Sequence, residues 1–343
     1  MRKAKETLKL IDASLDRDGG AAYRQNLQWL LPKMEDAYRG YSAPFRSHLG
    51  ASLLGKKCGR ELWYSFHWAS VKIVEPRLMR LFNRGHLEEA RFLSLLKTAG
   101  FKLWFETDDG GQFKFSGIDG HFGSALDGVV VGIPELPEGV AAYAEFKTSA
   151  DKGFQKIVKD GVANCKWEHY VQMQECMHFM QLPYALYMVV NKNDDSLHAE
   201  IIEYDKDTAE RYLDRGATVI YSPEPLPMIH PSPGWWECKF CDFIGVCKKG
   251  EAPSINCRTC AHSTPMPDGT WWCERGHYDI INSDEAHKGC VEHLYNPTML
   301  QGAKVIATDA AQNMVKLQLA SGEEIDHGPG YFTSQDLKER GLK

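Results

Sequence analysis

The stretch SALDGVVVGIPELPEGVAAYAEFK constrains this chain most strongly, because it predicts a β-hairpin that carries three charged side chains. Its two halves, 125–133 and 140–147, are rich in β-branched and small apolar residues and flank the turn-forming sequence PELPEG. Side chains alternate along a strand, so Glu145 and Lys147 share one face, and Asp127 on the preceding strand can lie opposite them. The hairpin therefore predicts two carboxylates and one ammonium group in one place.

These three groups suit a hard divalent cation acting on phosphate esters. Mg²⁺ takes oxygen ligands and usually keeps several waters, so Asp127 and Glu145 are a sufficient protein contribution to a catalytic metal site. Lys147 would orient the attacking water or stabilise the charge that develops on the phosphorane. The hairpin is therefore a candidate active site.

Composition limits the other possibilities. The 343 residues are 43% hydrophobic, which allows one large domain with appendages or two domains. A net charge of −6 argues against binding nucleic acid by bulk attraction, so a phosphate-binding surface must be local and metal ions must help neutralise the substrate. No apolar run reaches about 18 residues and no secretory signal is present, so we expect a cytoplasmic protein without a membrane span. In a reducing compartment, its ten cysteines indicate metal ligands.

The segments before the hairpin are expected to be helical. Apolar residues recur at helical spacing through residues 1–45, and Gly85 is expected to interrupt the pattern before an amphipathic helix over 87–97. Glu89 falls on the inward stripe of that helix, whereas Glu88 more easily reaches solvent. The periodicity alone leaves a structural ion pair and a place in the active site equally open for Glu89.

The segments after the hairpin continue the alternation of helices and strands. A helix over 168–180 carries Gln172, a second hairpin surrounds the sequence NKNDDS, and a closing helix spans 207–221. Between the first hairpin and Gln172 lie four lysines, in a stretch that is partly a solvated helix face and is also a candidate for binding a phosphate backbone. The last of the four is Lys166, and the other three are the candidate phosphate contacts. These three are Lys152, Lys156 and Lys159.

This order of elements resembles the core of PD-(D/E)XK nucleases, within the RecB-like branch that includes phage λ-type and YqaJ-type exonucleases. The matching pieces are RGHLEEA, LDG, EFK and YVQMQ, in order over residues 85–205. The resemblance implies an α/β fold with a central mixed sheet flanked by helices. One departure is Cys176, which stands where relatives often have a tyrosine four residues after the glutamine.

The resemblance also implies roles for individual residues. Glu89 becomes a helical metal-site acid, and Asp127 and Glu145 become ligands of Mg²⁺ or Mn²⁺. Lys147 becomes the catalytic lysine, and Gln172 contacts the substrate or a water in the active site.

A C-x₂-C-x₅-C run supplies three thiols, and a four-coordinate site needs a fourth ligand, for which Cys58 is the unclaimed candidate. Taken alone, Cys58 is better explained as a small buried hydrophobe. The set resembles the iron–sulfur nucleases of the AddB and CRISPR-associated RecB-type groups, which implies a [4Fe–4S] cluster, with Zn²⁺ as the alternative. Its members are Cys58, Cys238, Cys241 and Cys247.

A second cysteine set is spaced C-x₂-C-x₁₂-C-x₁₆-C in a segment too small for a core of its own, which indicates a structural zinc ribbon. Trp271 and Trp272 beside it could stack on bases, or pack around the metal. The cysteines are Cys257, Cys260, Cys273 and Cys290, and alternative ligands are His262, His277 and His293.

Three parts are therefore expected: a nuclease domain with an N-terminal helical region over 1–250, a zinc-ribbon-like module over 251–298, and a small β-containing tail over 299–343. We expect a Mg²⁺-dependent DNA exonuclease with little sequence preference, acting in phage recombination or genome processing in the host cytoplasm. A single-strand annealing protein is a candidate partner, and an oligomer is compatible with the sequence. The alternatives are a nuclease component of a CRISPR adaptation or repair complex, and a non-catalytic DNA-binding module with structural metal sites.

Overall fold

The computed structural model describes residues 2–34, 46–71, 74–276 and 283–342. Its centre is a six-stranded sheet in the order β1-β9-β8-β7-β6-β3, in which β7 and β8 run parallel and the other described pairs are antiparallel. The fold is thus α/β with a mixed sheet, as expected. In sheet order, the strands are Arg2–Lys3, Leu197–Glu203, Tyr184–Asn191, Ala141–Ser149, Gly128–Val131 and Lys102–Trp104.

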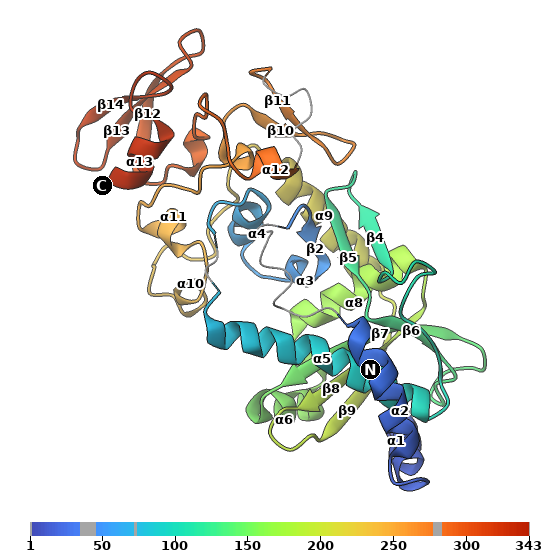
Figure 1. Cartoon of the computed structure of the whole chain (residues 1–343). Helices are drawn as coiled ribbons and strands as arrows, with labels where there is room; N and C mark the ends of the chain where they lie inside the picture. Colours follow the sequence, from blue (N-terminus) through green and yellow to red (C-terminus); the bar gives the residue numbers. More distant parts are fainter. Residues whose placement is uncertain (1, 35–45, 72–73, 277–282, 343) are drawn as a thin grey trace.

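Helices cover both faces of this sheet (Figure 1). One face packs against α1, α2 and α5, which are Lys5–Asp16, Ala21–Leu30 and Pro76–Thr98. The other face packs against α6, α7 and α8, which are Asp151–Asp160, Val162–Cys165 and Trp167–Met180.

Strand β7 shows how alternation sorts its side chains between these two layers. Phe146 stacks on Phe92 of α5 with 4.9 Å between ring centroids, whereas Tyr143 is buried with Met173 on the α8 side. Odd and even positions of a strand point to opposite faces. Glu145 and Lys147 therefore lie on the α8 side of the sheet.

The first half of the hairpin differs from the expected single strand over 125–133. Two strands occupy this stretch: β5 (Phe122–Ala125) pairs with β2 (Leu49–Gly50) and β4 (Lys114–Gly117) in a separate small sheet, and β6 joins the main sheet. The chain passes from one sheet to the other at a bend that holds Asp127. The bend places this carboxylate at the boundary between the sheets.

Gly85 does not interrupt α5, which is the second difference. The helix runs through it from Pro76, and no described atom lies within 4 Å of a Cβ built at that position. One glycine in a helix interior costs about 1 kcal/mol relative to alanine, and the packing of this 23-residue helix on the sheet and α2 offsets that cost.

A second region lies on the far side of α8. It contains α3 (Ala51–Leu54), α4 (Gly59–Phe66) and α9 (Lys206–Tyr221), whose apolar side chains form a cluster with Val171 of α8. The helix α8 and the second hairpin β8–β9 match their expected positions, as does α9. The helix α8 therefore forms a wall shared by two hydrophobic clusters.

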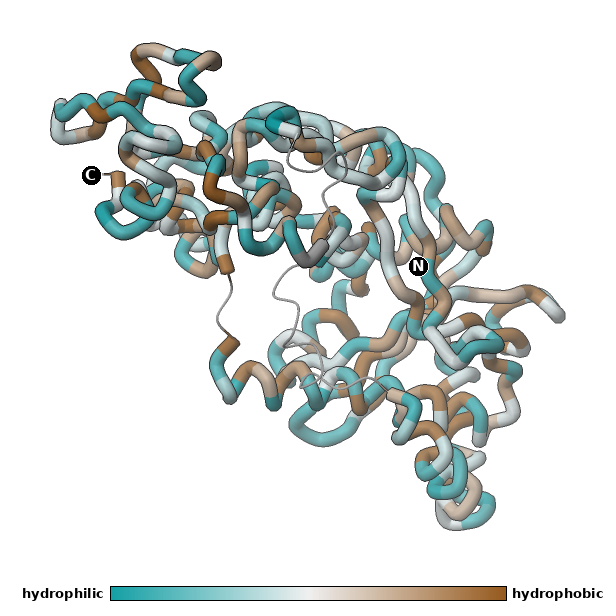
Figure 2. Tube along the Cα trace, turned by 45° about the horizontal axis from the view of Figure 1, so that its top comes forward, coloured by the Kyte–Doolittle hydropathy of each residue, from teal (hydrophilic) through white to brown (hydrophobic). Residues whose placement is uncertain are grey.

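The C-terminal third adds short elements to this second region. Figure 1 places the C-terminal end and the helices α1 and α2 at opposite ends of the molecule, and the marked N- and C-terminal ends also lie apart in the turned view of Figure 2. The three-stranded tail sheet and its closing helix agree with the expected β-containing tail. The elements are α10 (Trp236–Lys239), α11 (Ile244–Lys248), β10 (Ser263–Pro265), β11 (Trp271–Cys273), α12 (Ser283–Ala286), β12 (Ala303–Asp309), β13 (Met314–Leu319), β14 (Glu324–His327) and α13 (Ser334–Arg340).

Arg258 ties this C-terminal part to the rest of the chain. Its buried guanidinium donates to the carbonyl oxygens of Phe66 and Ser47 at 2.9 and 2.6 Å and lies 3.8 Å from the ring centroid of Trp68. Burial lowers the pKa of Arg258 to about 9. The same guanidinium lies 4.6 Å from the ring centroid of Trp271, which belongs to the same hydrophobic cluster as Phe66 and Trp68.

None of the helices in the described ranges combines the length and apolarity that a membrane crossing requires.

Candidate active site

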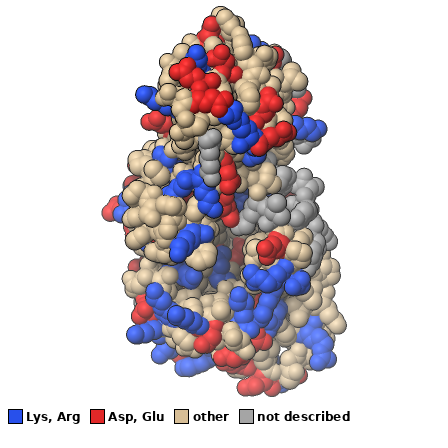
Figure 3. All heavy atoms as spheres, turned by 90° about the vertical axis from the view of Figure 1, so that its left-hand side faces the viewer, with Lys and Arg blue, Asp and Glu red and all other residues tan. Residues whose placement is uncertain are grey.

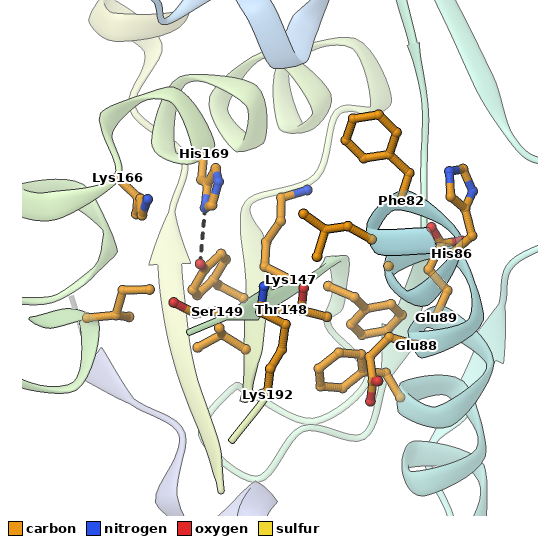
Figure 4. Close-up of a pocket in the computed structure, with 17 residues that line it drawn as sticks. Phe82, His86, Glu88, Glu89, Lys147, Thr148, Ser149, Lys166, His169 and Lys192 are labelled. Carbon is orange, nitrogen blue, oxygen red and sulfur yellow. Dashed lines mark hydrogen bonds between the residues drawn. The ribbon is translucent and has the colours of Figure 1, made fainter. Parts of the chain in front are cut away.

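A cavity of about 450 Å³ opens between α5, the carboxyl ends of β7 and β8, and the start of α8 (Figure 4). Because β7 and β8 are parallel, their carboxyl ends meet at one edge of the sheet. Lys147 points into the cavity from its floor, with His169 on the α8 side and Glu89 on the α5 side (Figure 4). The cavity thus gathers side chains from three distant parts of the sequence.

Glu145 is fully buried beneath this cavity. Its Oε2 accepts hydrogen bonds from the Tyr143 hydroxyl and from Nε2 of Gln172, the latter at 3.1 Å. Its Oε1 forms an ion pair with the ammonium group of Lys147. A buried carboxylate needs cationic partners, and Lys147 supplies one of them.

Asp127 lies beside Glu145, where the two strands meet. Its Oδ2 accepts a hydrogen bond of 2.8 Å from the backbone N–H of Phe146. Burial and the charge of Glu145 raise the pKa of Asp127 to about 7, although Lys147 and the hydrogen bond from Phe146 oppose the shift. The hairpin brings the two carboxylates together as expected, at a cost in electrostatic repulsion that a bound cation would relieve.

Lys147 keeps its charge in this setting. Burial lowers its pKa, but the charges of Glu145 and Asp127 outweigh burial and raise the pKa above the ordinary value for lysine. The charge of Glu89 acts in the same direction. The ammonium group therefore remains protonated at neutral pH among three carboxylates.

Glu88 and Glu89 both line the cavity, but Glu88 does not have the exposure that the helical period predicts for it. Glu89 is half-buried and also lines a smaller cavity together with Asp127, which places it beside the candidate active site. Glu88 is buried and forms an ion pair of 3.1 Å with Arg91, so the expectation that Glu88 reaches solvent is wrong. Burial raises its pKa against the effect of Arg91.

The cavity also contains His169 and Lys192, which were not anticipated from the sequence, and Lys166, the last lysine of the stretch expected to bind phosphates. His169 Nδ1 lies 3.1 Å from the hydroxyl of Tyr187, and burial together with the charges of Lys147 and Lys166 lowers the pKa of His169 to about 3. The imidazole is therefore neutral. Its position three residues before Gln172, on the same face of α8, was the only available signal in the sequence.

The three lysines expected to bind the phosphate backbone lie on α6 and are exposed. They are not among the residues lining the described cavity, which is bordered on this side by Lys166 and Lys192. Their role stays a prediction.

The first cysteine set converges although its members are far apart in sequence. Cys58, Cys238, Cys241 and Cys247 line one small cavity beneath α4 and α11. Burial raises the pKa of Cys241 to about 12 and also raises that of Cys247. Raised values are those of uncharged thiols buried without a metal, and a metal would stabilise the thiolates instead.

The second set also converges. Its thiols lie close enough together for the charge of one to raise the pKa of another. Burial is the largest cause and brings the pKa of Cys257 to about 12 and that of Cys260 to about 11. Backbone N–H groups of His262 and Leu294 oppose the shift by hydrogen bonding to Cys260. N–H groups directed at sulfur favour the thiolate form that a metal requires.

Within the ranges that the structure describes, no group of three or more His, Cys, Asp or Glu side chains has an arrangement that could hold a metal ion. The metals expected at both cysteine sets and at the hairpin are therefore predictions.

Two of the histidines considered as alternative metal ligands for the second cysteine set contact other side chains. His262 lies 2.6 Å from Asn313, and His293 lies 2.8 Å from Ser334, while His277 lies outside the described residues. Trp271 is buried, which favours packing over base stacking, whereas Trp272 is partly exposed.

No protein-family model matches the sequence, and no curated protein matches it. The solved structures to which the chain is similar include the crystal structure of SSO0001, at 18% identity and a TM-score of 0.39, covering 64% of this chain and 95% of that chain. An alkaline exonuclease (LHK-Exo) from Laribacter hongkongensis is 15% identical with a TM-score of 0.36, covering 53% of this chain and 90% of its own. LHK-Exo in complex with dAMP is 16% identical with a TM-score of 0.36, covering 50% and 86%. Similarity at this level identifies neither a family nor a function.

Proposed function

We propose that this chain is a Mg²⁺- or Mn²⁺-dependent deoxyribonuclease of the PD-(D/E)XK kind. The observation that carries the proposal is the buried Glu145 beside Asp127, with the charged Lys147 at the floor of an open cavity. Two adjacent carboxylates and a lysine are expensive to bury, and a protein that only binds DNA has no need to keep them together.

The donor set fits a hard divalent cation. Asp127 and Glu145 offer adjacent carboxylate oxygens, and Glu89 is a third candidate ligand across the cavity. Oxygen ligands of this kind suit Mg²⁺ and Mn²⁺. The bound ion would lower the pKa of a water and polarise the scissile phosphate.

The remaining side chains hold the substrate and the ligands in place. In our proposal, the Lys147 ammonium group stabilises the negative charge that develops on the phosphate, and Gln172 fixes Oε2 of Glu145 through its hydrogen bond. Tyr187 donates its hydroxyl hydrogen to Nδ1 of His169, so that the other ring nitrogen carries the hydrogen and donates toward a phosphate oxygen. Lys166 and Lys192 contact the flanking phosphates.

The proposal extends to the two cysteine sets. Cys58, Cys238, Cys241 and Cys247 would bind a [4Fe–4S] cluster, and Zn²⁺ is the alternative for the same thiols. The second set, supported by the mutual effects of its thiols on their pKa values, would bind a structural Zn²⁺. Both metals would act on folding and not on the reaction.

We favour an exonuclease without sequence preference, acting on DNA in phage recombination or genome processing. The basis is the order of the motifs RGHLEEA, LDG, EFK and YVQMQ in the sequence. A nuclease component of a CRISPR adaptation or repair complex would use the same site. Cytoplasmic location, an annealing-protein partner and oligomer formation remain parts of this hypothesis.

End-labelled linear DNA and closed circular DNA, incubated with and without Mg²⁺, test the proposal directly. We expect the linear DNA to be degraded from its ends only in the presence of Mg²⁺ or Mn²⁺, while the circle stays intact. Nicking of the circle would replace the exonuclease by an endonuclease. A folded protein that binds both DNAs and hydrolyses neither would instead be a non-catalytic binding module.

A further inference from the structure

Three large aromatic side chains are exposed together around the short helix α10. Trp235, Trp236 and Phe240 have exposed fractions of 38%, 59% and 85%. We call these three residues the aromatic patch. Exposed apolar groups that lie together on a soluble protein mark interaction surfaces more often than scattered ones do.

The aromatic patch is held in a defined geometry. Trp236 and Phe240 are four residues apart and therefore share one face of the helical turn. Trp235 stacks on His230 with 4.5 Å between ring centroids, and its Nε1 donates a 3.0 Å hydrogen bond to Glu237. A fixed ring loses little conformational freedom when a flat partner stacks on it.

Cationic groups accompany the rings. The ammonium nitrogen of Lys57 lies 5.6 Å from the ring centroid of Trp236, and the exposed Lys239 directly precedes Phe240 at the end of α10. The acidic neighbour, Glu237, is already paired with Lys57 at 2.9 Å. Flat apolar rings beside ammonium groups match a partner that alternates flat bases with phosphates.

The aromatic patch lies on the same side of the molecule as the first turns of α5 (Figure 1). Seen from that side, Lys and Arg side chains gather around a hollow in the middle of the molecule (Figure 3). The first turns of α5 expose Arg77, Arg80 and Arg84. Leu81 and Phe82, on the same turns, line the candidate active-site cavity. A strand bound at the patch could therefore continue toward the cavity over a basic surface.

We propose that the aromatic patch binds single-stranded DNA, with bases stacked on Trp236 and Phe240 and phosphates near Lys57 and Lys239. The inference deepens the proposed function, because it names the form of DNA held beside the catalytic cavity. It does not depend on hydrolysis, since stacking and phosphate contact need no metal at the hairpin.

The test measures binding of a short fluorescent oligo(dT) to the full chain in Ca²⁺, with the Asp127→Asn variant as the parent to prevent cleavage. Base stacking on an aromatic side chain is worth roughly 1–3 kcal/mol, so Trp236→Ala and Phe240→Ala should each weaken binding by about tenfold. Phe240 is almost fully exposed, so its removal should leave folding intact. Lys57→Gln should reduce the slope of log affinity against log salt by about one unit or less.

Trp104→Ala is the matched control, because Trp104 is 48% exposed on strand β3. It should leave oligo(dT) binding unchanged. Equal affinity of the parent, Trp236→Ala and Phe240→Ala would overturn the inference. So would a self-association of the parent, measured by sedimentation, that the patch variants abolish while oligo(dT) binding persists, since the patch would then be a protein interface.

The two proposals can fail separately. Hydrolysis of DNA by the unmodified chain, with oligo(dT) binding indifferent to the patch, would retain the nuclease and reject the patch. Patch-dependent oligo(dT) binding by a chain that hydrolyses no DNA in Mg²⁺ or Mn²⁺ would retain the patch and reject the nuclease.

Discussion

The helix α8 separates two regions that bury reactive groups in different ways. On its sheet side, the buried Glu145 lies against the half-buried Asp127 and Lys147, and charges of both signs remain at close range. On its other side, Cys58 and Cys241 lie half-buried in one small cavity with two other thiols, and burial raises the pKa of Cys241 so that its thiol is neutral. One region retains charge that a substrate and a cation can use, and the other retains thiols that join distant segments.

This difference predicts which property, catalysis or folding stability, each kind of residue affects when it is replaced. Removing a repelling carboxylate from the sheet side relieves an electrostatic cost, so the fold should tolerate the change while catalysis does not. Removing a thiol from the other side deletes a link between distant segments, so the fold should suffer first. The predictions that follow test this division, beginning with the largest effect.

Asp127→Ala, Glu145→Ala and Lys147→Ala should each lower the rate of DNA hydrolysis by about 10³-fold or more, because each removes a cation ligand or the stabilising ammonium group. Initial rates in Mg²⁺ and thermal unfolding midpoints measure the two effects, with midpoints close to that of the unmodified chain. Glu210→Ala, on the outer face of α9, is the control. Full activity of purified Asp127→Ala in EDTA would contradict the assignment.

Cys238→Ala should lower the unfolding midpoint by about 10 °C, because losing one ligand of a structural metal costs several kcal/mol. Protein purified without oxygen should be brown and contain iron and zinc, and this variant should lose the colour. Cys257→Ala should keep the colour and lose zinc.

Cys165→Ala is the control, since Cys165 belongs to neither set and lies partly buried on α7. A colourless, active preparation with two zinc ions and no iron would show that the first site holds a different metal. The four thiols of that site would still meet.

Glu175 lies on α8, the helix between the two regions, and makes the stability of the protein depend on pH. Both of its carboxylate oxygens are buried without a hydrogen bond among the described residues. Burial raises its pKa from 4.5 to about 8. Between these values the folded chain holds a proton that the unfolded chain releases, so stability falls as pH rises, by about 1 kcal/mol per pH unit. Glu175→Gln should flatten this dependence and stabilise the protein at pH 8.

Chemical unfolding at several pH values measures the effect, with Glu210→Gln as the control because its side chain is exposed. The same slope in Glu175→Gln and in the unmodified chain would show that this carboxyl is not the source of the dependence.

Lys152→Gln, Lys156→Gln and Lys159→Gln carry the smallest expected effect, because these side chains lie on the outer face of α6. If each contacts a phosphate, each change should reduce the salt slope of DNA binding by about one unit, equally for all sequences. An unchanged slope would remove α6 from the DNA path. Strong cutting of one sequence over others would replace the exonuclease by a restriction-like enzyme.

The sequence predicted the parts of the site that depend on local geometry. Alternation along β7 was enough to place Glu145 and Lys147 on one face, whereas the helical period placed Glu89 on the inward stripe and left its role open. The bend at Asp127 was missed because it depends on β5 pairing with strands of another sheet.

The residues that were missed depend on long-range packing. Lys192 follows β8 and reaches the cavity only because β8 is parallel to β7, and His169 is fixed by Tyr187 from the same strand. The burial of Glu88 depends on its ion pair with Arg91, which periodicity does not reveal. The aromatic patch stands out only once its exposure is known, because aromatic residues in a sequence more often indicate a core.

The buried guanidinium of Arg258 sets a limit on how far the protein can be shortened. A chain ending at Gly250 would contain every residue of the candidate active-site cavity, yet the carbonyls of Phe66 and Ser47 would lose their donor, and the rings of Phe66 and Trp68 would lose the guanidinium that packs on them. Such a fragment would expose the apolar aromatic surface of these rings to solvent and is expected to aggregate. The smallest stably folded unit of this protein therefore extends beyond the residues of the candidate active site.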